Sequence, residues 1–193
     1  MAKLKAFSSG PEAGSTLLEV LVATVLMATG ILAMAQMFGL STRTNQTARN
    51  NTFATVLAEQ KLEQLRALAW GFDVQGLPMS DFSTDTARET ESPTGGTGLQ
   101  PSPAGTLREN RAGYVDHVDA QGKILGGETA PPDGTVYTRR WSIEPLPTNP
   151  NNTLILQVLV TRVSRDRGQA NLGNVARLND EARVITVKTR KAR

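Results

Sequence analysis

The residue types that could do chemistry are few in this chain. It has no cysteine, and His117 is its one histidine, so Cys-based redox or metal sites and multi-histidine zinc sites are excluded. For the same reason no Cys–His or Ser-His-Asp arrangement can be proposed. Asp116, His117 and Asp119 could be read as a metal cluster, but Asp119 opens a turn-forming stretch, and we interpret the three as part of a hairpin.

Three further aspartates, Asp81, Asp85 and Asp133, are scattered without the spacing of a calcium loop. A glycine-rich run at 92–98 lacks a following Lys-Ser/Thr and opens no helix, so it does not predict a phosphate loop. We therefore expect no catalytic residues, no metal site, no cofactor and no small-molecule substrate.

The most unusual ionisable residue is Glu19, which has apolar residues on both sides. A carboxylate in an apolar environment is costly unless it is paired, and charged groups inside membrane segments are usually functional. The alternative is that Glu19 only marks the membrane interface. After Glu19 the next base along the chain is Arg43, 24 residues on, so no base follows within the apolar run and a partner has to come from elsewhere.

A run of 21 residues without a charge, Val20–Leu40, follows Glu19. About 20 apolar residues are enough to cross a bilayer as a helix. Lys3 and Lys5 precede the run and favour a cytoplasmic N-terminus, although Arg43 and Arg49 after it weaken that asymmetry. We expect the long helix to extend over residues 15–70, with 15–40 in a membrane or filament core.

Gly14-Ser15-Thr16-Leu17-Leu18-Glu19, followed by Val20-Leu21-Val22-Ala23, resembles the processing site of type IV prepilins and type II secretion pseudopilins. The resemblance implies a leader at 1–14, cleavage between Gly14 and Ser15 by a prepilin peptidase, and N-methylation of Ser15. It also implies that Glu19 acts in assembly. Ser15 stands where these families usually have phenylalanine.

The second part of the predicted helix, residues 41–70, is amphipathic. Apolar residues recur at spacings of three and four, and charged residues, Lys61 among them, are assigned to the other faces. Gly71 is well placed as the C-terminal cap. Gln36 occupies the position where many major pilins have proline, which favours a minor pilin or a pseudopilin. The apolar stripe consists of Ala54, Leu57, Ala58, Leu62, Leu65, Leu68 and Ala69.

Residues 71–193 are predicted to form a β-rich head. Residues 71–113 read as a long, solvated surface connection. A hairpin is expected over 113–125, with further strands at 135–144, 154–163 and 183–189. The apolar strand 154–163 is predicted to be interior in the sheet. The strand 135–144 carries Tyr137, Trp141 and Ile143 on one face. A polar segment at 166–180 separates the last two strands.

Charge is unevenly distributed along the chain. Residues 71–182 carry −4 and residues 183–193 carry +5, so the head is an acidic body with a basic tail. This distribution argues against general nucleic-acid binding. We expect the tail at 190–193 to be a solvated terminus, since short charge runs usually are.

Two segments, 137–144 with the following strand and 58–69, are similar to the type IV pilus modification proteins, the minor pilins called V. The expected fold is therefore α+β and pilin-like, a long N-terminal helix packed on a small antiparallel sheet. The expected partners are the prepilin peptidase, other minor and major pilins, and the inner membrane, with the head in the periplasm and later in a pilus. The alternatives are a type II secretion pseudopilin, a membrane-anchored periplasmic binding module, and a DNA-uptake pilin.

Overall fold

The computed structural model describes residues 16–88, 94–163 and 181–190. The chain divides into two compact units, Met1–Gln46 and Thr47–Arg193. Helix α1, Leu17–Ala67, is 51 residues long and contributes its first part to one unit and its last part to the other. No proline interrupts it, so an unbroken backbone hydrogen-bond ladder is possible throughout. The predicted long helix is confirmed for these residues, while Ser15 lies outside the described part of the chain.

The helix ends three residues earlier than predicted. Trp70–Phe72 is the short strand β1, which pairs antiparallel with β2, Pro78–Ser80. Gly71 lies inside β1 and its φ is not positive, so its prediction as the helix cap was wrong. The end of the helix is capped instead by Lys188, whose Nζ donates to the carbonyl oxygen of Arg66. A cation at this end satisfies a free carbonyl and complements the helix dipole.

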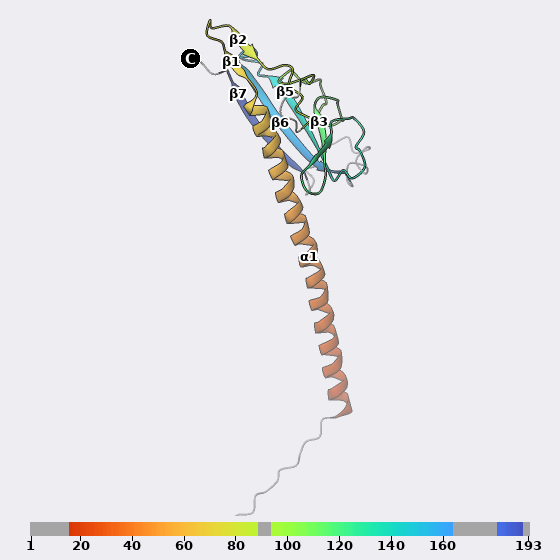
Figure 1. The fold of residues 1–193 in the computed structure, drawn as a ribbon. Coiled ribbons are helices and arrows are strands. Elements are labelled where there is room, and N and C mark those ends of the chain that lie inside the picture. The colour runs from red at the N-terminus through yellow and green to blue at the C-terminus, as the bar shows by residue number, and fades with distance from the viewer. Residues whose placement is uncertain (1–15, 89–93, 164–180, 191–193) are drawn as a thin grey trace, which may run out of the picture. The chain divides into compact units, whose positions relative to one another are not determined.

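The head contains a five-stranded, fully antiparallel sheet with strand order β4-β3-β5-β6-β7 (Figure 1). Its strands are β3 (Val115–Val118), β4 (Ile124–Gly126), β5 (Tyr137–Pro145), β6 (Thr153–Arg162) and β7 (Ala182–Thr189). The predicted hairpin corresponds to β3 and β4, and β6 is an interior strand between β5 and β7, as predicted. Together with α1 this layout confirms the α+β class and is consistent with a pilin-like fold.

One core joins the last turns of α1 to the inner face of the sheet. Ala54, Leu57, Ala58, Leu62 and Leu65 are buried, which confirms most of the predicted stripe, whereas Ala69 lies beyond the helix and is exposed. From the sheet, the same cluster receives Tyr137, Trp141, Ile143, Leu154, Leu156, Val158 and Val160. Trp141 is fully buried on the face predicted for it, although the other face of β5 is also buried from Thr138 to Ser142.

The connection at 71–113 is not simply a solvated surface loop, and here the prediction was wrong. Leu99 is completely buried and Ala87 nearly so. The backbone N–H groups of Gly95 and Gly96 both donate to the carbonyl of Ser83, and that of Gly98 donates to the carbonyl of Thr84. At Gly96 and Gly98 two backbone segments lie too close for side chains between them, since an added Cβ would lie 2.1 Å from Asp85 Cα and 2.5 Å from the carbonyl oxygen of Asp81.

Candidate functional site

The first candidate site is the N-terminal turn of α1, which contains Glu19. The backbone N–H of Glu19 donates to the carbonyl oxygen of Thr16 at 2.9 Å and lies 3.3 Å from its Oγ1. Thr16 is therefore the N-cap, and Thr-Leu-Leu-Glu has the spacing of a capping box. This capping of the Glu19 backbone N–H by Thr16 was not among the sequence expectations, although the Thr-x-x-Glu spacing signals it. Gly14 and Ser15 lie outside the described residues.

The apolar helix that follows Glu19 offers no partner for the carboxylate. Every side chain from Thr16 to Gln46 is exposed within the chain, and no described residue forms an ion pair with Glu19. Thr24 and Thr29 donate to the carbonyls of Leu21 and Leu26, so their hydroxyls need no water. By length and composition this helix could cross a membrane.

A second group of charges lies at the interface between α1 and the sheet, and all three side chains are at most 1% exposed. Lys61 Nζ lies 2.7 Å from Asp116 Oδ2. Arg139 binds the same carboxylate in bidentate fashion, with Nε 2.7 Å from Oδ1 and Nη2 2.9 Å from Oδ2. Lys61 was predicted on an exposed face, which was wrong, because position 61 lies in the apolar stripe, four residues after Leu57 and four before Leu65.

This buried group is fully engaged in structural contacts. Lys61 Nζ also donates to Gln64 Oε1 at 2.7 Å and to the carbonyl of Thr86, and it lies 4.6 Å from the ring centroid of Trp141. Burial lowers the pKa of Lys61 to about 8, while the Asp116 carboxylate acts in the opposite direction. Both oxygens of Asp116 accept charged hydrogen bonds, so neither is free for proton transfer.

The residues weighed as metal ligands have other roles. His117 Nε2 lies 2.8 Å from the carbonyl of Glu128, and Asp119 Oδ1 accepts from the backbone N–H groups of Gln121 and Lys123. Within the described ranges there is no group of three or more His, Cys, Asp or Glu residues that could hold a metal ion. Asp116 and His117 lie on β3 and Asp119 opens the turn to β4, which confirms the hairpin interpretation of these residues.

The scattered aspartates also stabilise loops. Asp81 accepts from Thr84 Oγ1 at 2.6 Å and from the backbone N–H groups of Ser83 and Thr84. These hydrogen bonds lower the pKa of Asp81 below its usual value, although burial acts in the opposite sense. Asp85 caps the N–H of Ala87 and pairs with Arg88.

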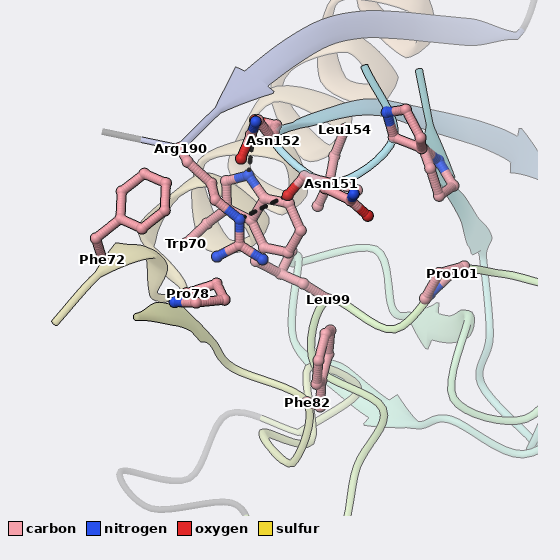
Figure 2. Close-up of a pocket in the computed structure, with 12 residues that line it drawn as sticks. Trp70, Phe72, Pro78, Phe82, Leu99, Pro101, Asn151, Asn152, Leu154 and Arg190 are labelled. Carbon is pink, nitrogen blue, oxygen red and sulfur yellow. Dashed lines mark hydrogen bonds between the residues drawn. The ribbon is translucent and has the colours of Figure 1, made fainter. Parts of the chain in front are cut away.

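A hollow of about 510 Å³ lies beside Arg190 in the head (Figure 2). Its walls are mainly aromatic rings, prolines and leucines, and Arg190 is the one charged residue among the lining residues that the structure describes. Sequence reasoning missed this site, because its parts come from five separate segments. The lining residues are Trp70, Phe72, Pro78, Phe82, Leu99, Pro101, Pro145, Pro150, Asn151, Asn152, Leu154 and Arg190.

Arg190 was expected to belong to a solvated terminus, and that expectation was wrong. Its guanidinium carbon lies 3.7 Å from the ring centroid of Trp70. It donates to the carbonyls of Asn151, Gly71 and Met79, so it fastens the chain after β7 to the β1–β2 hairpin. Residues 191–193 of the basic tail lie outside the described part of the chain.

Comparisons with protein-family models, with curated proteins and with solved structures find no match for this chain.

Proposed function

We propose that this chain is a minor pilin of a type IV pilus, a structural subunit that helps to start, cap or modify the filament. The observation that carries the proposal is the position of Glu19. It is the single ionisable residue between Thr16 and Arg43, in the first turn of a helix whose side chains up to Gln46 are all exposed within the chain. Gly14 precedes it at the spacing of a prepilin processing site.

The physical logic concerns charge pairing. Cleavage after Gly14 would create a cationic amine on Ser15 of each mature subunit. In a filament, the Glu19 carboxylate of one subunit can pair with the amine of a neighbour, which satisfies both charges inside an apolar core. An unpaired charge there is strongly destabilising, so this pairing favours one axial register between neighbouring subunits and disfavours the others.

In this proposal the protein has no catalytic role. It is a substrate of the prepilin peptidase, which would cleave before Ser15 and methylate its amine. It then sits in the inner membrane with a cytoplasmic N-terminus and a periplasmic head until it joins other minor and major pilins. The apolar helix is compatible with the membrane anchor that this requires. In the head, the buried charges of Lys61, Asp116 and Arg139 are paired with one another, which suits a structural role.

A type II secretion pseudopilin would use the same helix and the same carboxylate, and neighbouring genes would tell the two apart. A membrane-anchored binding module is favoured by a different observation, the apolar hollow beside Arg190, and it predicts that no leader is removed. A DNA-uptake pilin predicts salt-sensitive DNA binding at the basic tail.

The deciding experiment is N-terminal mass spectrometry of the protein extracted from membranes of cells with an active prepilin peptidase. We expect a mature chain that begins at Ser15, with a methylated amine. Replacing Gly14 with a bulkier residue should block processing. An intact N-terminus at Met1 or Ala2 in wild-type cells contradicts the proposal and favours the anchored binding module.

A further inference from the structure

The guanidinium of Arg190 is fixed in the wall of the hollow by neutral groups. Nε donates to the carbonyl of Asn151 at 2.7 Å, and Nη1 donates to the carbonyls of Gly71 at 2.9 Å and Met79 at 2.8 Å. Nη2 donates to Ser80 Oγ at 2.9 Å. None of these acceptors carries a charge, so they hold the cation in place without neutralising it.

Arg190 also has no carboxylate partner among the described residues, since none of their ion pairs includes it. One N–H of Nη2 has no acceptor in that same part of the chain. The group stacks on Trp70 and lies 5.9 Å from the ring centroid of Phe72. A guanidinium held over an aromatic face is pre-organised, so an anion that binds it need not restrict its rotamers.

Apolar surface surrounds this cation. Figure 2 shows Leu99 and Phe82 on one side of the guanidinium and Phe72 and Pro78 on another. Phe82 is 45% exposed, so its ring is accessible from the hollow. The volume of about 510 Å³ lies within the range of roughly 300–1,000 Å³ that is typical of small-ligand pockets. Such a site can hold an aromatic or aliphatic side chain together with one small anionic group.

We propose that this hollow binds a peptide that presents a carboxylate next to an aromatic or aliphatic side chain. The carboxylate would meet Arg190, and the apolar side chain would pack among Trp70, Phe82 and Leu99. Guanidinium and carboxylate form the stronger class of hydrogen bond, and the apolar walls exclude water from it. The proposal concerns the head alone and does not depend on the filament role.

A polypeptide is favoured over a free small molecule because apolar surface continues beyond the hollow. The β1–β2 hairpin contributes Phe72 and Pro78 to the wall and carries Leu77 and Met79, which are 62% and 49% exposed. Charge points to the same partner, since the described lining residues include Arg190 and no acid, so an acidic segment complements the site.

The test uses the full chain in detergent micelles and follows the indole N–H signal of Trp70 by NMR. The probes are N-acetylphenylalanine, its neutral amide, and acetate. We expect N-acetylphenylalanine to shift the Trp70 signal with a Kd at least tenfold lower than that of either of the other two. Equal affinity for the acid and the amide, or no shift of Trp70 with the acid, would overturn the proposal.

Variants test the assigned groups. Arg190→Gln should weaken binding of N-acetylphenylalanine at least tenfold, while Arg183→Gln, which removes an exposed charge from the same end of the chain, should leave it unchanged. Because Arg190 also fastens the hairpin, Phe82→Ser provides a second variant that removes only an exposed wall residue and should also weaken binding. If both Arg190→Gln and Phe82→Ser bind as the wild type does, this hollow is not the site.

The source of the carboxylate is resolved by one further probe, a blocked dipeptide with Phe followed by Asp and an amidated end. Binding of both this dipeptide and N-acetylphenylalanine indicates an internal acidic segment of a partner. Binding of N-acetylphenylalanine alone indicates capture of a chain terminus. Both results support a peptide carboxylate as the ligand, and failure of both probes to bind would overturn the proposal.

Discussion

Lys61 Nζ lies 2.7 Å from Asp116 Oδ2, with both side chains completely buried where α1 packs against β3 and β5 of the sheet. Arg139 on β5 binds the other side of the same carboxylate. One carboxylate therefore pairs with two bases, which come from a helix and a strand far apart in the sequence. This pairing fixes how the helix is placed on the sheet within the head, because a shift of either element would leave a buried charge unpaired.

The first prediction is that the head folds without the apolar helix. Thr47–Arg193 is a compact unit, and the buried part of α1 begins only at Ala54. A chain that begins at Thr42 should therefore be soluble and unfold cooperatively, which circular dichroism in urea can measure. Aggregation, or a gradual loss of signal without a transition, would mean that residues before Thr42 are needed for the core.

The second prediction concerns the buried carboxylate. Asp116→Ala leaves both Lys61 and Arg139 buried without an acid, so the free energy of unfolding should fall by about 3–5 kcal/mol. The measurement is urea unfolding of the chain that begins at Thr42. The matched control is Glu63→Ala, which removes the exposed pair with Arg66 (side chains 66% and 52% exposed) and should cost less than about 1 kcal/mol. Similar losses in the two variants would show that the Asp116 network is not a main determinant of stability.

The third prediction follows from the pKa of Lys61, which burial lowers from 10.5 to about 8 in the folded protein. Between these pH values the unfolded chain keeps a proton on Lys61 that the folded chain has lost, so the free energy of unfolding rises with pH. The rise is on the order of 2–3 kcal/mol over that window, and Lys61→Met should abolish it.

The measurement is the difference in urea unfolding between the wild-type head and Lys61→Met at several pH values. Burial raises the pKa of Tyr114, which lowers stability as the pH passes 10, but this contribution is common to both proteins and cancels in the difference. A difference that stays constant from pH 8 to pH 10.5 would contradict the lowered pKa of Lys61.

The fourth prediction concerns the glycine-rich run. A Cβ on Gly96 would lie 2.1 Å from Asp85 Cα, a backbone atom that cannot move aside cheaply. Gly96→Ala should therefore destabilise the head by at least about 1–3 kcal/mol, as overpacking does. Gly71→Ala is the control, since nothing lies within 4 Å of its added Cβ, and its effect should be within about 0.5 kcal/mol. A thermal melt of each variant gives the comparison, and equal stability of the two would refute the close approach.

The strands and the helix could be predicted because their apolar residues follow the periods of two and 3.6 that burial imposes. Lys61 was misplaced because its residue type suggested solvent, whereas its spacing from Leu57 and Leu65 puts it on the buried face. Its partner Asp116 could not be identified, since no local pattern links a helix to a strand 55 positions later. The pairing is a property of the tertiary fold.

The hollow beside Arg190 could not be predicted from the sequence for a related reason. Proline, asparagine and glycine predict turns wherever they occur, and they give no indication of which turns meet in space. Trp70 and Asn152 are joined by a hydrogen bond of 3.3 Å across 82 positions of the chain. Glu19 is the opposite case, because its sequence neighbours alone identify it as unusual, and the structure adds the capping contact with Thr16.

The last prediction separates the two roles of Glu19, namely the local cap and pairing between subunits. Its nearest base along the helix, Arg43, is 24 residues away, which is about 36 Å at 1.5 Å per residue, so the two cannot meet. Glu19→Gln keeps a side chain that suits a capping box but removes the charge. Thr16→Ala removes the cap but keeps the carboxylate.

If charge pairing places the subunit, Glu19→Gln and Glu19→Ala should be cleaved normally yet be depleted from sheared filaments. Thr16→Ala should be incorporated as the wild type is. Quantitative immunoblots of the sheared and membrane fractions measure both steps. If Glu19→Gln enters filaments at the wild-type level while Thr16→Ala does not, the helix cap is what matters, and Glu19 is then only a capping residue at the membrane interface.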